Sequence, residues 1–148
     1  MNNIGNKSIL IIDDDTRLVN ALAKVLTGEG AAVIRADWAG DAIGMVVGGE
    51  RPIDLVITDL RMPFVSGLTV VFAIHKAHPE LPIIVLTAFG SPEVKAECMR
   101  QGARAFVEKP VDAQQLLGEI EKAFASPAPD PNSNHYPAKN QMERNELI

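Results

Sequence analysis

Two short apolar runs that both end in aspartate constrain the fold most. Ser8–Asp13 reads SILIID, and Leu55–Thr58 reads LVIT directly before Asp59. Runs of this length, rich in branched residues, are typical of buried strands. The residues after Asp59 include Pro63 and Gly67, so Asp59 stands where a strand gives way to a loop. Ligands of open α/β sheets bind beyond the carboxyl ends of the strands, and the two runs therefore predict a functional edge.

Acidic side chains gather at this predicted edge. Asp13, Asp14 and Asp15 end the first run, and Asp59 ends the second. If the two strands are parallel neighbours, three or four carboxylates meet, and each raises the pKa of the others. A hard divalent cation relieves that repulsion, and Mg²⁺ is the usual choice beside a phosphoryl group. Alone, Asp59 would be better explained as a turn cap; its acidic neighbours favour a site.

The chain alternates strand and helix patterns in five units. This alternation predicts an α/β fold with a parallel sheet, right-handed crossovers and helices on both faces. The third helix is expected to turn Leu68, Val71 and Phe72 toward the core. The predicted strands are Ser8–Asp13, Ala31–Ala36, Asp54–Asp59, Pro82–Thr87 and Ala103–Val107. The predicted helices run from Asp15 or Thr16 to Gly28, from Trp38 to Val47, from Leu68 to Ala77, from Ser91 to Gln101 and from Asp112 to Ala125.

Length and charge narrow the class of protein. The chain has 148 residues and is 47% apolar, which suits one globular domain. Its formal charge is −5 and it has no Lys/Arg cluster, which argues against direct nucleic-acid binding. No run approaches a membrane span, and the N-terminus lacks a secretion signal. The single cysteine, Cys98, agrees with a cytoplasmic location.

Composition also divides the chain. Residues 1–7 are expected to be an N-terminal tail and residues 8–125 the folded domain. From residue 126 the sequence becomes rich in Pro, Ser and Asn without an apolar period. Residues 126–148 are therefore predicted to be an extended linker or tail, leading toward an output domain absent from this chain or toward a partner.

Four short motifs give the chain a family resemblance. They are IIDDD at 11–15, DLVITDLRMP at 54–63, VLTA at 85–88 and VEKP at 107–110. In this order and spacing the chain resembles the receiver domains of two-component response regulators, over roughly Ser8–Ala125. The resemblance implies a flavodoxin-like (βα)5 fold with strand order 2-1-3-4-5. It also implies that Asp59 accepts a phosphoryl group from a phosphohistidine of a sensor kinase or phosphotransfer protein.

The resemblance assigns a role to each acidic residue. Asp59 would be the nucleophile that forms an aspartyl phosphate. Asp14 and Asp59 would bind Mg²⁺ directly, Asp13 mainly through water, and Arg61 through its backbone carbonyl. Asp15 is expected to cap the first helix, although three consecutive acids leave the register open. We choose Asp13 and Asp14 because they directly follow the apolar run.

Three further residues would complete the site and its switch. Lys109 would contact the phosphoryl group, and its bond to Pro110 would be cis; without Pro110 an ordinary solvated lysine would be the better interpretation. Thr87 would donate its hydroxyl to a phosphoryl oxygen. Phe106 would be the switch aromatic that turns inward, although it could also be an ordinary core residue. The surface of the fourth helix, fifth strand and fifth helix would then bind an output domain or downstream partner.

These expectations describe a signalling switch rather than an enzyme with a metabolite substrate. The chain would catalyse only its own Mg²⁺-dependent phosphorylation and dephosphorylation. An aspartyl-phosphate phosphatase commonly carries a second acid two residues after the nucleophile, where this chain has Arg61. A flavodoxin-like cofactor binder would need a Ser/Thr/Gly-rich loop after the first strand, where acids stand. The sequence leaves open whether the chain forms a homodimer.

Overall fold

The computed structural model describes residues 4–49, 51–61 and 66–126. Its five strands form one parallel sheet in the order β2-β1-β3-β4-β5, which confirms the predicted α/β class and strand order. The strands are β1 (Ser8–Ile12), β2 (Ala32–Ala36), β3 (Leu55–Thr58), β4 (Ile83–Thr87) and β5 (Ala105–Glu108). The helices are α1 (Thr16–Gly28), α2 (Ala39–Gly48), α3 (Gly67–Ala77), α4 (Pro92–Gln101) and α5 (Ala113–Ala125).

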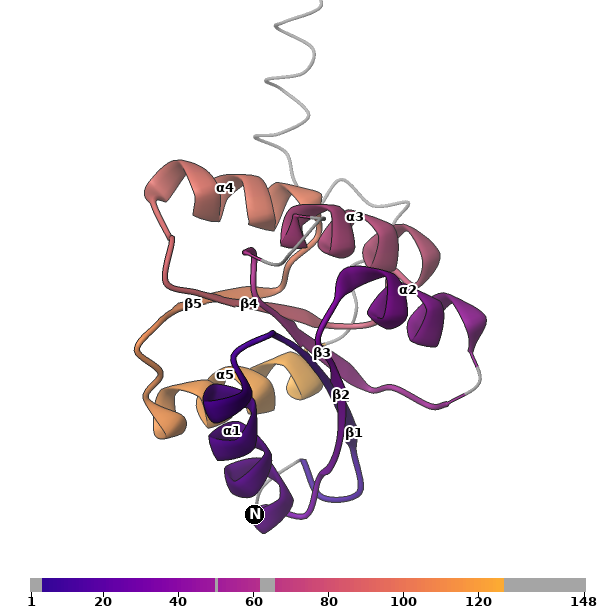
Figure 1. Cartoon of the computed structure of the whole chain (residues 1–148), viewed down its shortest axis with the longest axis vertical. Helices are drawn as coiled ribbons and strands as arrows, with labels where there is room; N and C mark the ends of the chain where they lie inside the picture. The colour runs from indigo at the N-terminus through magenta and orange to yellow at the C-terminus, as the bar shows by residue number, and fades with distance from the viewer. Residues whose placement is uncertain (1–3, 50, 62–65, 127–148) are drawn as a thin grey trace, which may run out of the picture.

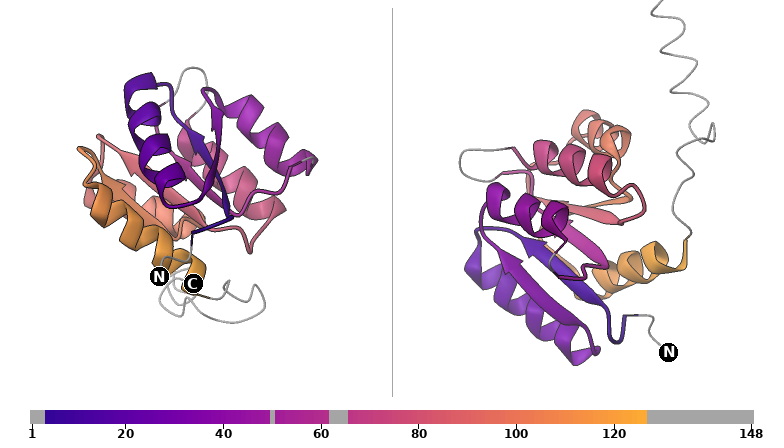
Figure 2. Two further views of the ribbon diagram at one scale, coloured as in Figure 1. Left: turned by 90° about the horizontal axis from the view of Figure 1, so that it is seen from below. Right: turned by 90° about the vertical axis from the view of Figure 1, so that its right-hand side faces the viewer.

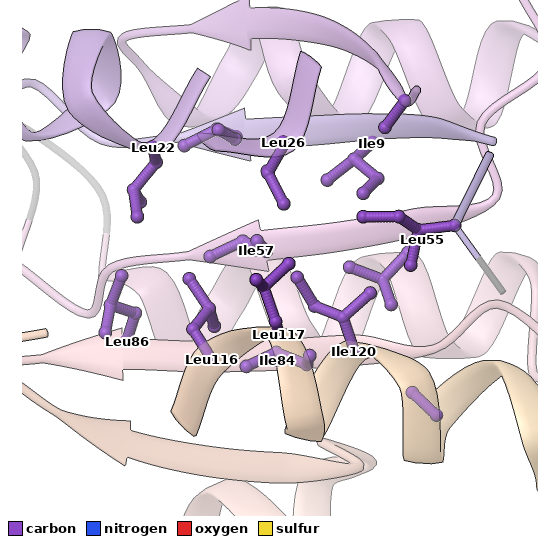
Figure 3. Packing of buried hydrophobic residues seen from close by; sticks show 14 of the residues in the cluster. Ile9, Leu22, Leu26, Leu55, Ile57, Ile84, Leu86, Leu116, Leu117 and Ile120 are labelled. Carbon is purple, nitrogen blue, oxygen red and sulfur yellow. The ribbon is translucent and has the colours of Figure 1, made fainter. Parts of the chain in front are cut away.

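The helices cover both faces of the sheet, as Figures 1 and 2 show. Helices α1 and α5 lie on one face, and α2, α3 and α4 on the other. Successive side chains of a strand point to opposite faces, so Ile9 of β1 packs under α1 and α5 while Leu10 packs under α2 and α3. Figure 3 shows the first cluster, which includes Leu26 of α1, Ile57 of β3 and Ile120 of α5. Each such fully buried side chain contributes about 1.5–3 kcal/mol of hydrophobic transfer free energy.

Polar side chains start the helices where the sequence predicts. The Asp15 carboxylate accepts the Leu18 N–H at 3.2 Å, and the Ser91 hydroxyl accepts the Val94 N–H at 3.1 Å. The Asp112 carboxylate accepts the Gln114 N–H at 2.9 Å. These caps satisfy backbone donors that have no partner within the helix, and they fix where each loop ends.

The predicted core face of α3 is wrong by one residue. Phe72 is 52% exposed, whereas Val70, Val71 and Ile74 are fully buried. These three residues follow the i, i+1, i+4 arrangement of a single helical stripe. The prediction kept Val71 but rotated the stripe toward Phe72, because apolar residues cover most of this helix and leave no clear stripe.

The start of the chain is packed onto the domain where it is described. Ile4 is fully buried, and the Asn6 N–H donates to the Gly30 carbonyl at 3.0 Å. The Lys7 ammonium lies 5.3 Å from the centre of the Phe124 ring in the last turn of α5. Residues 4–7 of the expected N-terminal tail are therefore anchored by apolar and cation–π contacts. The predicted linker lies outside the described residues from 127 onward.

No helix in the described part of the chain is both long and apolar enough to cross a bilayer.

Candidate functional site

The pairing of β1 with β3 brings the acidic residues together. Ile12 is the partner of Thr58, so Asp13 and Asp59 leave the sheet side by side. The Asp59 N–H donates to the Ile12 carbonyl at 3.0 Å, which holds Asp59 beside the end of β1. One carboxylate oxygen from each of Asp13, Asp14 and Asp59 lies within 4.8 Å of the others. Asp13 and Asp59 are only 6% exposed, whereas Asp14 is exposed, so the cluster has one open side.

Lys109 supplies the positive charge of this cluster. Its backbone N–H donates to the Thr87 carbonyl at 2.9 Å, directly after β5. Its ammonium donates to Asp13 Oδ2 at 2.9 Å and to Asp59 Oδ2 at 3.2 Å. The Lys109–Pro110 peptide bond is cis, as the resemblance implies. The lysine thus bridges two buried carboxylates that come from different strands.

Burial and charge shift the pKa values of this group. Burial raises the pKa of Asp13 above 3.8, and the Asp59 carboxylate adds to the increase. The Asp15 N–H and the Lys109 ammonium lower it only in part. Burial by itself lowers the pKa of Lys109, but the hydrogen bond and charge of Asp13, with Asp59, outweigh it and raise that pKa. The raised pKa of Asp13 therefore reflects mainly the loss of water around its carboxylate, which the Lys109 ammonium offsets only in part.

We expect Asp13→Asn to stabilise the fold at neutral pH without Mg²⁺. Because the folded pKa of Asp13 is raised, its ionised form is disfavoured by folding. The stability linked to this group is present below its unfolded pKa of 3.8 and is lost as pH rises through the folded value. Urea unfolding in EDTA should show a higher midpoint for Asp13→Asn than for the wild-type chain at about pH 7. At about pH 3 the two midpoints should be the same.

The matched control is Asp112→Asn, which makes the same substitution at an exposed helix cap that asparagine also serves. A gain for Asp13→Asn of equal size at both pH values, or a loss at neutral pH, would contradict the electrostatic explanation.

Asp15 is directed away from the cluster. Its N–H donates to Asp13 Oδ1 at 2.9 Å, and its own carboxylate caps α1. This geometry separates Asp15 from Asp13 and Asp14 in the way that the sequence analysis expected. It also gives Asp13 a hydrogen bond that orients its carboxylate toward Lys109.

Thr87 and Phe106 lie beside the cluster without joining it. Thr87 is fully buried at the end of β4, and its hydroxyl accepts the Phe89 N–H at 3.2 Å. The half-buried Phe106 ring of β5 lies against Gly90, where an added Cβ would be 2.9 Å from ring atom Cε1. Gly90 therefore leaves the space that this aromatic side chain occupies under the β4–α4 loop.

Two contacts around Asp59 were missed by the sequence analysis. A Cβ on Gly67 would lie 2.1 Å from the Asp59 carbonyl oxygen, so the start of α3 approaches this backbone closely. The Arg61 guanidinium lies 3.8 Å from the centre of the Phe89 ring. Arg61 stands two residues after Asp59 and Phe89 two residues after Thr87, on the loops that follow neighbouring strands β3 and β4, and this shared offset was the available signal.

The Asp59 carboxylate is fixed by its own loop. Its Oδ1 accepts the Leu60 N–H at 2.7 Å and is 3.4 Å from the Arg61 nitrogen. Its Oδ2 faces Lys109. Both oxygens are thus oriented before any ligand binds. Three acids, one lysine and a parallel five-stranded sheet define an acidic site at the strand ends of a doubly wound α/β protein.

Comparison with known proteins gives the family. The family model for the response regulator receiver domain matches residues 9–121. The chain belongs to this family of two-component signalling switches.

Individual relatives agree. The chain is 38% identical over 121 residues to the transcriptional regulatory protein GlrR of Escherichia coli, covering 82% of this chain and 27% of GlrR. A receiver domain structure from Clostridium thermocellum is 31% identical with a TM-score of 0.75, covering 80% of this chain and 94% of that one. A CheY-like receiver domain from Methanospirillum hungatei JF-1 is 30% identical with a TM-score of 0.76, covering 82% and 96%. The chain spans about a quarter of the length of the curated relatives that it matches.

Proposed function

We propose that Asp59 is the phosphoacceptor of this receiver domain. The observation that carries the proposal is the convergence of Asp13, Asp14, Asp59 and Lys109 at one edge of the sheet. An Asp59 carboxylate oxygen would attack the phosphorus of a phosphohistidine, and the phosphorus–nitrogen bond would break as the imidazole leaves. Lys109 would then pair with the phosphoryl oxygens, because its ammonium already contacts the Asp59 oxygen beside Asp13.

We propose Mg²⁺ as the metal of this site. Asp13, Asp14 and Asp59 offer the oxygen ligands that this ion prefers, and the exposure of Asp14 leaves room for water ligands. The backbone carbonyl of Arg61 is a further ligand that the family resemblance implies. When bound, the ion would neutralise charge on the transferring phosphoryl group. Three carboxylates beside the single ammonium of Lys109 leave negative charge for such an ion to compensate.

The conformational switch that we propose consists of movements of Thr87 and Phe106. The Thr87 hydroxyl, now bound to the Phe89 N–H, would turn to a phosphoryl oxygen on Asp59. The half-buried Phe106 beside it would move further inward, and the α4–β5–α5 surface would change. This is a shift between two populations driven by one local charge.

Domain boundaries at about residues 8 and 125 fit the described fold and remain part of the proposal.

The partners follow from the same chemistry. A sensor kinase or phosphotransfer protein would supply the phosphohistidine, and an output domain or a second copy of the chain would bind the α4–β5–α5 surface. Because GlrR is named as a transcriptional regulatory protein, we propose that the output is control of transcription. The buried free Cys98 suits the reducing cytoplasm.

A labelling experiment tests this function. The chain is incubated with Mg²⁺ and acetyl phosphate, reduced with borohydride to trap the acyl phosphate, and mapped by mass spectrometry. We expect a single modified residue, Asp59, and a strong reduction of labelling when EDTA removes the metal. Labelling at another residue, or none under any donor, would contradict the proposal.

A further inference from the structure

A hollow lies beside the acidic cluster and extends beyond the residues that phosphoacceptance would use. Its volume is about 630 Å³, and it is bounded by the carboxyl end of β2 and the first turns of α1 and α2. Asp13 and Asp14 of the acidic cluster line it together with Asp37, Trp38 and Asp41. The chain passes here from β2 into α2, and α2 lies on the opposite face of the sheet from α1 (Figure 1). The hollow thus opens next to the site and reaches beyond it.

Trp38 is an ordered aromatic surface in this hollow. It is the only tryptophan of the chain and is 50% exposed. Its ring rests on Gly40, where an added Cβ would lie 2.3 Å from ring atom Cζ3. The absence of a side chain at residue 40 therefore lets the indole lie against the first turn of α2. Exposed tryptophans held in one position are the residues that most often dominate protein interfaces.

The charge of the hollow is strongly unbalanced. Four carboxylates line it, those of Asp13, Asp14, Asp37 and Asp41, against the single cation of Arg35, whose guanidinium donates to the Asn20 amide oxygen outside the lining. Asp41 also suits the positive end of the α2 dipole, but this does not explain Asp37 or the position of Trp38. A planar cation fits the combination of carboxylates and an indole better than any neutral group.

We propose that this hollow binds an arginine side chain of the protein that delivers the phosphoryl group. The guanidinium would stack on Trp38 and pair with Asp37 and Asp41. The inference rests on the proposed function, because the hollow shares Asp13 and Asp14 with that site. A phosphohistidine protein reaching Asp59 would cover this adjoining surface, whereas a small phosphodonor would not. Asp37, Trp38 and Asp41 would then select the partner without taking part in the chemistry.

Tryptophan fluorescence tests the cation site directly. The full chain, saturated with Mg²⁺, is titrated with a short peptide containing two arginines and with the same peptide containing citrulline, which has the shape of arginine without the charge. Because Trp38 is the only tryptophan of the chain, its fluorescence can be excited selectively. We expect a saturable response at least about fivefold tighter for the arginine peptide, as exposed cation–π and ion-pair contacts allow.

Two variants separate charge from stacking. Asp37→Asn/Asp41→Asn keeps the indole and should abolish the preference for arginine. Gly40→Ala keeps both acids and should weaken binding, because its Cβ displaces the ring. Equal binding of the two peptides, or an unchanged preference in the double variant, would overturn the proposal. So would displacement of the arginine peptide by raising Mg²⁺ at constant ionic strength, since the hollow would then belong to the metal site.

A transfer experiment tests the partner. Phosphorylation rates of Trp38→Ala and Trp38→Phe are measured with two donors. One is a sensor kinase that phosphorylates the wild-type chain, and the other is acetyl phosphate. Transfer from the kinase to Trp38→Ala should slow about fivefold more than labelling by acetyl phosphate, and Trp38→Phe should restore most of it. Equal slowing with both donors would overturn the docking role. A wild-type chain that neither donor labels would refute the phosphoacceptor proposal, while the peptide titration would still decide whether the hollow binds arginine.

Discussion

The Asp59→Asn variant should carry no phosphoryl group after incubation with Mg²⁺ and acetyl phosphate. An amide oxygen is a far weaker nucleophile than a carboxylate, so the bond to phosphorus would not form. The fold should survive, because asparagine keeps the oxygen that accepts the Leu60 N–H and removes one of three adjacent negative charges. Intact-protein mass spectrometry measures the adduct, and circular dichroism confirms the fold.

The neighbouring acids provide matched controls for that result. Asp15→Asn should label like the wild-type chain, because Asp15 caps α1 and asparagine caps equally well. Asp14→Asn should lower labelling at a fixed Mg²⁺ concentration and recover as Mg²⁺ is raised, since one oxygen ligand is weakened. A normal adduct in Asp59→Asn would refute the nucleophile. Loss of labelling in Asp15→Asn with retention in Asp14→Asn would shift the metal register by one residue.

The strands were predictable because their signal is local. β1 and β3 are continuous apolar runs, and a strand buried on both faces requires this pattern. Helix starts were predictable for a similar reason, since Asp15, Ser91 and Asp112 act within three residues of themselves. The strand order came from the family resemblance, because the sequence pattern alone does not fix which strands pair.

The core face of α3 was less predictable. Gly67, Val70, Val71 and Ile74 are buried while Phe72 is exposed. A helix with apolar residues on most of its surface gives no clear stripe, so the side that meets the sheet is decided by packing. The close approach of Gly67 to the Asp59 carbonyl selects that side, and no local pattern contains this information.

The candidate site was also predictable only where the signal is local. The acids were found because strand ends meet at one edge of a parallel sheet. The Lys109 contact with Asp13 joins residues 96 positions apart, and only the resemblance pointed to it. The stack of Arg61 on Phe89 was missed, although the two residues share the same offset from Asp59 and Thr87. Contacts between loops depend on side-chain conformations that the sequence pattern does not encode.

That stack leads to an expectation about the lifetime of the phosphorylated state. Arg61 follows β3 and Phe89 follows β4, so together they flank Asp59 on neighbouring loops. Held against each other, they would shield a phosphoryl group on Asp59 from attacking water. A cation–π contact contributes about 0.5–2 kcal/mol, which corresponds to roughly 2- to 30-fold in a rate. Arg61→Ala/Phe89→Ala should therefore lose its phosphoryl group faster than the wild-type chain by a factor in that range.

Release of phosphate from labelled protein, after the donor is removed, measures this rate. The matched control is Phe72→Ala/Lys76→Ala, which removes another exposed phenylalanine and its cation, 5.8 Å from the ring centre, on α3. This control should leave the rate unchanged. Arg61→Lys keeps the charge but loses the planar stack, so it should fall between the wild-type chain and the double variant. Decay in the double variant that is slower than in the wild-type chain, or equal to it, would show that the stack does not shelter the phosphoryl group.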